Sequence, residues 1–364
     1  MSKDGKSEIT FMRGARSFIQ GRFESVAREA FDDGWTPEEK DERPLETQVT
    51  IERSRSILSH NDSPDVGFDT SINPYRGCEH GYIYCYARPS HAYLELSPGL
   101  DFETKLFAKT NAAELLRAEL AKPGYRPSPI ALGANTDCYQ PIERKYKITR
   151  QILEVLAECN HPVTMVTKSA LVERDLDVLG PMAQKNLVRV FVSIGTLDRE
   201  LARKLEPRAA SPQRRVDVLR NLAAAKVPCG VMVAALIPAL NDKTMEHVLE
   251  AAAAAGAEEA AYVIMRLPNE LKDLFKEWLA AHYPQRAEHV ISIVHQMRGG
   301  KDNDPRFGTR MTGLGNYADL MAKRFELACR KYGLNEHGAG RRRAELDCSL
   351  FSPPSANTGQ LALF

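Results

Sequence analysis

Six short apolar runs that alternate with stretches of helical periodicity restrict the fold of this chain more than any other feature. The run at residues 188–194 is rich in β-branched residues and apolar on both faces, as in a strand buried on both sides. Such alternation predicts a parallel sheet, either curled into a barrel-like shape or open and doubly wound. The predicted strands are residues 68–73, 129–133, 163–167, 188–194, 229–236 and 260–266.

The rest of the chain divides around this core. We predict a polar N-terminal extension at residues 1–60, an α/β core at 61–285, a C-terminal helical region at 286–340 and a tail at 341–364. No apolar run approaches the ~20 residues that span a bilayer, and the N-terminus lacks the apolar region of a secretory signal. We therefore expect a cytoplasmic protein without a membrane partner.

One short loop, residues 71–89, combines cysteines, glycines and aromatic residues. Cys78 and Cys85 are separated by six residues, with Tyr82 between them, so the spacing is Cys-x3-Tyr-x2-Cys. Three thiolates at this spacing can hold three irons of a four-iron cluster, but here a phenol takes the middle position. Seven cysteines, widely spaced, favour reduced thiols over a disulfide framework.

Polar residues follow the predicted strands at the points where the strands end. In a parallel sheet these carboxyl ends share one edge, where ligands bind. We therefore expect one collective site, although loops after strands are often polar for other reasons. Its expected members are Cys78, His80, Cys85, Asn135, Thr136, Asp137, Cys138, Thr167, Lys168, Ser193, Glu206, Arg208, Asn241, Asp242 and Arg266.

The cysteine loop resembles that of the radical S-adenosylmethionine proteins, which carry Cys-x3-Cys-x-aromatic-Cys after the first strand of a partial (β/α)6 TIM-like barrel. Further blocks resemble the spore photoproduct lyase-like "DNA repair photolyase" subgroup of bacterial proteins over residues 34–335. They are NPYRGCEHG, YCYARPSHAYL, SPGLDFETKLFAK, YQPIERKYKITR, LEPRAASPQRR and RFGTRMTGLGNYADL.

This resemblance implies a [4Fe-4S] cluster and S-adenosylmethionine as cofactors, with reductive cleavage to a 5′-deoxyadenosyl radical. It also implies a reductant such as flavodoxin or ferredoxin, and it makes a nucleic-acid base lesion a candidate substrate. Cys78 and Cys85 match cluster ligands. The positions that resemble cofactor contacts are Tyr84, Asn135, Thr136, Asp137, Lys168, Ser193, Glu206 and Arg208.

Tyr82 departs from this pattern, and three explanations stay open. The chain is a cluster-defective variant, or Tyr82, Cys138 or His80 completes a weakened cluster, or radical chemistry is lost and only binding remains. Spore photoproduct lyases use a cysteine as hydrogen donor at the position of Asn135 here, whereas Cys138, the candidate catalytic residue, lies three residues later. Glu95, where related proteins usually have glycine, is a second departure.

Two other classes of function compete with a radical enzyme. One is a cluster-free (β/α)6 protein that binds a nucleoside-like ligand. The other is a zinc-supported nucleic-acid-binding module that uses Cys78, His80 and Cys85 together with the arginine-rich ends, such as residues 341–343.

Overall fold

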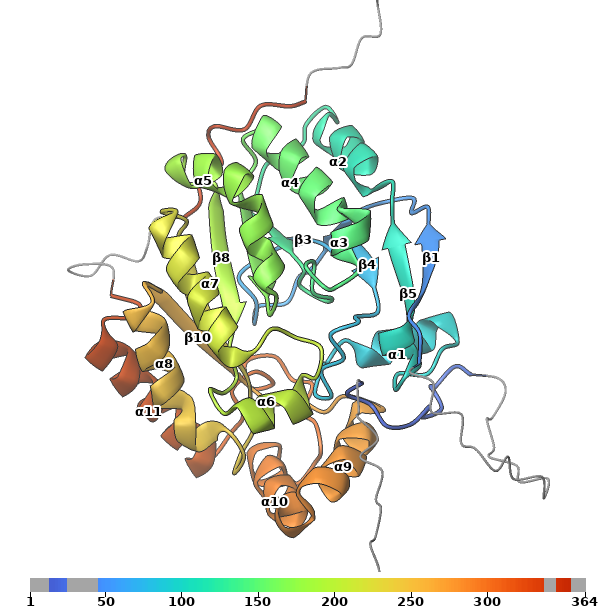
Figure 1. The fold of residues 1–364 in the computed structure, drawn as a ribbon, viewed down its shortest axis with the longest axis vertical. Coiled ribbons are helices and arrows are strands. Elements are labelled where there is room, and N and C mark those ends of the chain that lie inside the picture. The colour runs from blue at the N-terminus through green and yellow to red at the C-terminus, as the bar shows by residue number, and fades with distance from the viewer. Residues whose placement is uncertain (1–12, 25–44, 337–344, 355–364) are drawn as a thin grey trace, which may run out of the picture.

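A curled sheet of seven strands forms the centre of the molecule in the computed structural model, which describes residues 13–24, 45–336 and 345–354 (Figure 1). The strand order is β10-β9-β8-β7-β6-β3-β2. Six of these strands are parallel, and β2 pairs with β3 in the antiparallel sense. Their bounds are β2 Leu58–His60, β3 Thr70–Ile72, β6 Ile130–Leu132, β7 Val163–Thr167, β8 Val188–Ser193, β9 Cys229–Leu236 and β10 Glu259–Ile264.

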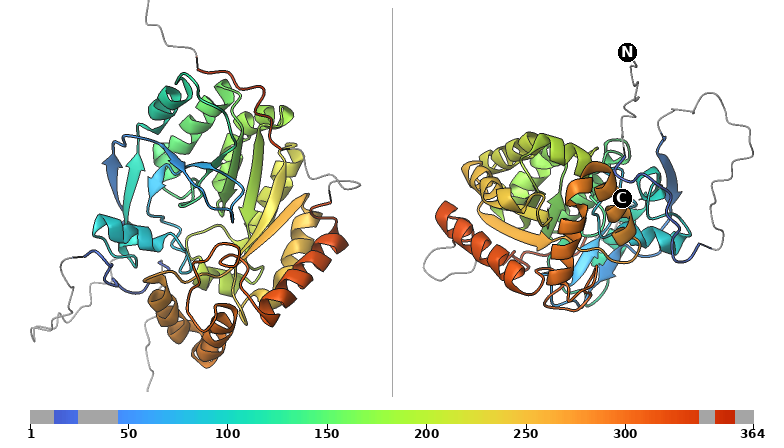
Figure 2. Two further views of the ribbon diagram at one scale, coloured as in Figure 1. Left: turned by 180° about the vertical axis from the view of Figure 1, so that it is seen from behind. Right: turned by 90° about the horizontal axis from the view of Figure 1, so that it is seen from below.

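The predicted partial (β/α)6 barrel is confirmed. β10 and β2 lie at opposite edges of the sheet, so the sheet curls without closing (Figure 2). The expected strands at residues 163–167 and 229–236 coincide with β7 and β9. Valine recurs in both strands, with threonine in β7 and alanine in β9, which suits burial between an inner layer and covering helices.

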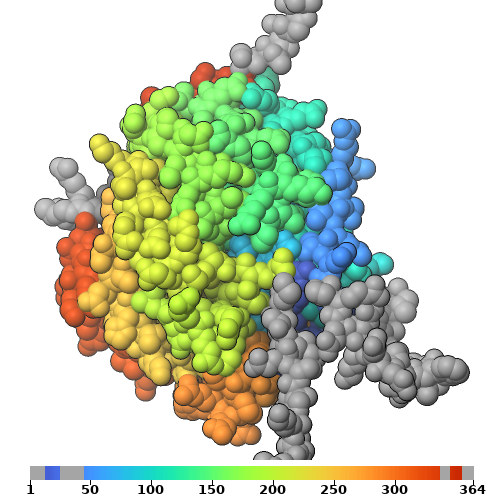
Figure 3. Space-filling view, viewed as in Figure 1, coloured from blue at the N-terminus to red at the C-terminus, as the bar shows by residue number. Residues whose placement is uncertain are grey.

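Helices cover the outer face of this sheet, and Figure 3 shows that their side chains hide the strands from that side. Seven of the described helices each bury an apolar face, and the helices over residues 271–297 bury theirs in the cluster that includes the cysteine loop. Their bounds are α2 Ala112–Leu120, α4 Ile148–Glu158, α7 Pro212–Ala224, α8 Met245–Ala254, α9 Leu271–His282, α10 Ala287–Met297 and α11 Asn316–Tyr332. Four further helices, α1 Asp101–Thr104, α3 Glu143–Tyr146, α5 Leu176–Gln184 and α6 Arg199–Leu205, are short.

A second, smaller sheet has the order β1-β5-β4. It joins β1 (Gln48–Glu52), from the expected N-terminal extension, in parallel to β5 (Lys105–Lys109), while β4 (Tyr75–Arg76) precedes the cysteine loop. Part of residues 1–60 is therefore built into the fold.

Another short element, the 3-10 helix η1 (Arg88–Leu94), ends at Glu95 with φ 54°, a left-handed conformation that suits the glycine of related proteins.

The apolar residues form one large core and a second cluster that reaches the cysteine loop. The second cluster combines Tyr82, Tyr84 and Ile83 with Trp278 and other residues of α9 and α10. Trp278 is 1% exposed, and its indole Nε1 donates to the carbonyl of Lys204 at 3.1 Å. Helices α9 and α10 therefore pack against the cysteine loop. In the part of the chain that the structure describes, no helix has the length and apolarity to cross a bilayer.

Residues 345–354 lie against the amino ends of the strands, beside a buried histidine. His161 is fully buried, its Nε2 lies 2.8 Å from the Tyr125 hydroxyl, and its ring packs against Phe351 with 5.4 Å between centroids. Burial lowers the pKa of His161 to about 4, so the ring stays neutral in the folded chain.

The free energy of unfolding is expected to fall as the pH drops from about 6.5 to 4. In this range His161 is protonated in the unfolded chain but stays neutral in the folded chain. The loss reaches roughly 3 kcal/mol for a shift of this size. Urea titrations across this range would measure it, with His161→Gln reducing the slope. His247→Gln, at an exposed position, is the control. Equal slopes for the parent and His161→Gln would contradict the assignment.

Candidate functional site

The cysteine loop turns tightly after β4, so that Cys78 and Cys85 lie on one small apolar cluster with Ala87 and Phe102. The amide of Cys78 donates to the carbonyl of Phe102 at 2.9 Å, and the amide of Cys85 donates to that of Tyr82 at 3.2 Å. Cys78 is 2% exposed and Cys85 is partly buried. Burial raises the pKa of both thiols in the chain without a ligand.

A buried carboxylate, Glu103, joins this loop to the N-terminal segment. Glu103 accepts from the amides of Gly14 at 2.9 Å and Ala15 at 2.7 Å, and it pairs with Arg88. Arg88 in turn donates from Nε to the carbonyl of Tyr82 at 2.8 Å. Both members of the ion pair are fully buried, so the N-terminal segment and the loop share one hydrogen-bond network.

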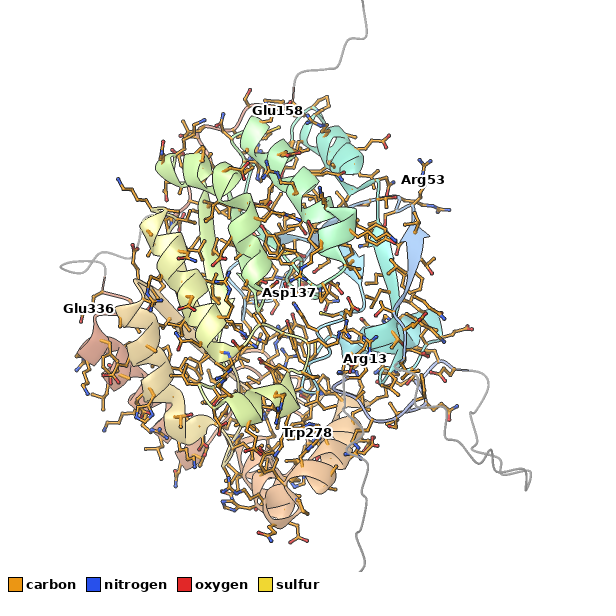
Figure 4. The ribbon with its side chains drawn as sticks, viewed as in Figure 1. Arg13, Arg53, Asp137, Glu158, Trp278 and Glu336 are labelled. Carbon is orange, nitrogen blue, oxygen red and sulfur yellow. The ribbon has the colours of Figure 1, made fainter. Side chains whose placement is uncertain are left out.

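Gly14 packs directly on the backbone of this loop. A Cβ at position 14 would lie 1.8 Å from the carbonyl oxygen of Gly81. Only glycine therefore permits this approach. Arg13 lies beside it, near α1 (Figure 4), and donates to the carbonyl of Glu103 at 2.8 Å.

The Tyr82 phenol points into the barrel and is held by two groups. Its oxygen lies 2.7 Å from Nδ1 of His80 and 3.0 Å from Oδ2 of Asp137. Burial and then the Asp137 carboxylate raise the pKa of Tyr82 well above its usual value, so the phenol keeps its proton. The ammonium of Lys168 lies 4.8 Å from the centre of the Tyr82 ring.

Asp137, labelled inside the ring of strands in Figure 4, organises the strand ends. Its carboxylate accepts from the amide of Lys168 at 2.8 Å and from the hydroxyl of Thr167 at 2.7 Å. Burial alone would raise the pKa of Asp137. The charge of His80 and these hydrogen bonds outweigh burial and hold the pKa of Asp137 well below its usual value.

A second network joins β7, β8 and the loop after α6. Lys168 donates to the Ser193 hydroxyl and to the carbonyl of Ala234, the latter at 3.2 Å, and its Nζ lies 3.9 Å from Glu206. Glu206 accepts from the hydroxyl of Tyr84 and pairs with the guanidinium of Arg215. Burial raises the pKa of Glu206, but Arg215 and Lys168 outweigh it and lower that pKa overall.

The structure brings together most of the predicted site. Tyr82, Tyr84, Asp137, Lys168, Ser193 and Glu206 form the two connected networks described above. Arg208 lies apart from them and pairs with Glu79 of the cysteine loop at 2.6 Å. Asn135 is exposed, and the Thr136 hydroxyl donates to the carbonyl of Tyr75 at 2.8 Å.

The candidate catalytic thiol, Cys138, lies in the core of the protein. Cys138 has no exposed surface and packs in the main core with Leu132, Tyr139 and their neighbours. The tight turn at Gly133 brings the thiol behind the strand end, 3.1 Å from where a Cβ of residue 133 would stand.

Arg215 is one of the site residues that were not predicted, together with Arg88 and Glu103. It lies on α7 with Val218, Leu219 and Leu222, which share its buried face. An arginine at a buried position of an amphipathic helix is a signal that it must pair inside the protein. Arg215 pairs with Glu206 and donates to the carbonyls of Ser193 at 3.0 Å and Ala210 at 2.7 Å.

The donor set does not fit three-thiolate ligation of a cluster. Cys78 and Cys85 supply two thiols, and the third position holds a protonated phenol that His80 and Asp137 already engage. Among the residues that the structure describes, no group of three or more His, Cys, Asp or Glu side chains is arranged to hold a metal ion. Residues 341–343, the basic stretch considered for nucleic acid, lie outside the described residues.

A six-stranded parallel half-barrel with a cysteine loop after its first barrel strand and charged residues at the strand ends is the architecture of radical S-adenosylmethionine proteins. The model of the Radical SAM superfamily matches residues 72–252. Residues 72–252 of this chain therefore form a radical S-adenosylmethionine domain.

Relatives in bacteria and archaea support this assignment. An uncharacterized protein of Mycobacterium tuberculosis (strain ATCC 25618 / H37Rv) is 39% identical over 220 residues, covering 60% of this chain and 65% of the relative. An uncharacterized protein of Methanocaldococcus jannaschii is 26% identical over 247 residues, covering 68% of this chain and 88% of the relative. The match thus spans less than two thirds of the length of the mycobacterial relative, namely 65%.

Among solved structures, the fold is similar to that of spore photoproduct lyase. The lyase complexed with dinucleoside spore photoproduct superimposes with a TM-score of 0.54 at 17% sequence identity, covering 78% of both chains. A double mutant of that enzyme with bound AdoMet and dinucleoside spore photoproduct gives 0.51 at 16% identity, with the same coverage. At this identity the likeness establishes the fold.

Proposed function

We propose that this chain binds S-adenosylmethionine at the carboxyl ends of β6 to β9, as a radical S-adenosylmethionine protein whose cluster assembly is limited by Tyr82. The observation that carries the proposal is the convergence of Asp137, Lys168 and Glu206 beside the cysteine loop, within the part of the chain that matches the family. Opposite charges at one strand edge suit a ligand with an ammonium, a carboxylate and a sulfonium.

In this proposal, different residues contact different chemical groups of S-adenosylmethionine. The Lys168 ammonium suits the ligand carboxylate, whereas Asp137 and Glu206 suit its cationic groups. The ring of Tyr84, 6.0 Å from that of Tyr82 and nearly parallel to it, offers an aromatic face for the adenine. Bound S-adenosylmethionine would supply the carbon–sulfur bond of its sulfonium, and reductive cleavage of this bond would give the radical. The cleavage would need a cluster and a reductant of the flavodoxin or ferredoxin type.

The site also supports a cluster-free alternative. The Tyr82–His80–Asp137 hydrogen bonds hold the loop together without a metal ion, so the pocket is organised for a nucleoside-like ligand on its own. Reduced thiols and iron chemistry favour the cytoplasm as the place of action. A nucleic-acid base lesion as the substrate stays a proposal that rests on the family.

Calorimetric titration of the purified chain with S-adenosylmethionine tests this proposal. We expect saturable binding of one ligand per chain that weakens about tenfold or more in Lys168→Met, because a charge-assisted hydrogen bond contributes about 1.5–3 kcal/mol. Lys185→Met, an exposed lysine on the far end of α5, is the matched control and should bind like the parent. Absence of binding in both the parent and Tyr82→Cys would overturn the proposal.

A further inference from the structure

The two edges of the open sheet are joined by a loop that follows α10. This loop, residues 299–315, contacts the end of β10, where the amide of Ile264 donates to the carbonyl of Met311 at 2.9 Å. It also contacts the segment after β2, because Arg310 pairs with Asp65 at 2.5 Å and the amide of Gly308 donates to the same carboxylate at 2.6 Å. The loop therefore bridges the side of the barrel that the sheet leaves open.

Positive charge gathers under this bridge. Arg266, at the end of β10, has no carboxylate partner among the described residues: its Nη1 lies 3.4 Å from the Met311 sulfur and its Nε makes no hydrogen bond. Burial and then the nearby charge of Arg310 lower the pKa of Arg266. Arg298, 1% exposed, is also nearby and donates to carbonyls, including that of Met265 at 3.1 Å. Among the described residues, Asp65 forms an ion pair with Arg310 and also attracts Arg266, and Asp304 attracts Arg298.

Two exposed aromatic rings flank these guanidinium groups. Tyr86 directly follows Cys85 and is 48% exposed, with the guanidinium of Arg266 5.6 Å from its ring centre. Its hydroxyl donates to the carbonyl of Ala134, which fixes the ring in place. Phe307 is 56% exposed, with the guanidinium of Arg310 4.7 Å from its ring centre.

We propose that this bridge, with Arg266, Tyr86, Phe307 and Arg310, binds a single strand of nucleic acid, its phosphate on Arg266 and unstacked bases on the two rings. A cation beside a flat exposed ring, repeated twice, is how proteins hold single strands, since guanidinium groups pair with phosphates and aromatic faces stack on bases. A duplex would keep its bases inside the helix and leave both rings without partners.

This inference rests on the proposed function in one respect: the bound strand would be the substrate. Tyr86 follows Cys85 directly in the chain, so a strand bound on the bridge would lie beside the cysteine loop. Binding of the strand itself requires neither S-adenosylmethionine nor a cluster. The two proposals can therefore fail separately: loss of strand binding with intact S-adenosylmethionine binding would overturn this inference alone.

Fluorescence anisotropy of a labelled 12-nucleotide single-stranded DNA, titrated with the full chain, tests the inference. We expect saturable binding that weakens about tenfold in Arg266→Met, with a salt dependence smaller by about 0.7 in log–log slope, because one phosphate contact is lost. Tyr86→Leu should weaken binding about tenfold by removing a stacking face, whereas Tyr86→Phe should retain it.

Matched controls and competitors distinguish binding at this bridge from nonspecific electrostatic binding of nucleic acid. Arg220→Met removes an exposed arginine that pairs with Asp217 on the outer face of α7, and it should bind like the parent. Duplex DNA should compete at least tenfold less well than the single strand. Equal loss in Arg220→Met, no saturable binding, or equal competition by a phosphopeptide of the same charge would overturn the inference.

Discussion

Tyr82→Cys is expected to raise the iron and sulfide content to about four of each per chain after anaerobic reconstitution, while the parent chain stays well below one cluster. The physical reason is the donor set: the substitution completes Cys-x3-Cys-x2-Cys and removes a phenol that His80 and Asp137 keep protonated. Iron and sulfide assays with an absorbance spectrum measure the change. Reductive cleavage of S-adenosylmethionine should appear in the same variant and not in the parent.

Tyr82→Ser provides the control for this experiment, because it removes the ring without adding a thiolate and should leave iron low. Tyr82→Phe keeps the ring but removes the hydroxyl, so its free energy of unfolding reports whether the contacts to His80 and Asp137 stabilise the loop. If the parent chain and Tyr82→Cys both take up about four irons, another group completes the site, and the assignment of Tyr82 as the limiting residue is wrong.

Arg215→Met is expected to lower the free energy of unfolding by about 3–5 kcal/mol, because removing one partner of a buried ion pair leaves the other charge without compensation. Both side chains of the pair are nearly inaccessible, 2% for Arg215 and 4% for Glu206. Glu206 would keep only the Lys168 ammonium, 3.9 Å away, and the Tyr84 hydroxyl. Denaturant titration measures the loss.

The neighbouring arginine on the same helix offers a matched control. Arg214 pairs with Glu173, but its side chain is 42% exposed, so water screens that pair. Arg214→Met should therefore lower the free energy of unfolding by less than about 1 kcal/mol. Similar losses in the two variants would mean that the buried network contributes little. Glu206→Gln alongside Arg215→Met should recover part of the loss, because the carboxylate that Arg215 leaves uncompensated is then neutral.

The barrel was predictable because its strands combine apolar residues with clear helical partners. Residues 188–194 lie between helices and an inner layer, so their composition alone indicated β8. Helix α5 was not predicted, since Gly180 and Pro181 interrupt its pattern, although Pro181 is tolerated there. The small sheet was missed because β1 is half exposed, with Ile51 53% exposed, and its partner β5 lies over 50 residues later in the chain.

The site was predictable at its strand ends and not in its hydrogen bonds between distant segments. Asp137 and Lys168 follow strands, so the shared edge of a parallel sheet placed them together. The partners of Glu103 and Glu206 come from distant segments, such as Gly14 and Tyr84, and a single sequence carries no signal for such pairs. Cys138 was misplaced because a tight turn at Gly133 directs its side chain into the core.

The contacts of residues 13–24 also determine the order of events during synthesis. This segment is synthesised before Glu103, Glu270 and Glu277, the residues that bind Gly14, Arg22 and Ser17. All of its contacts can therefore form only after residue 277 has been translated. Until Glu103 is available, Gly14 has no buried carboxylate to hold it against the backbone of the cysteine loop.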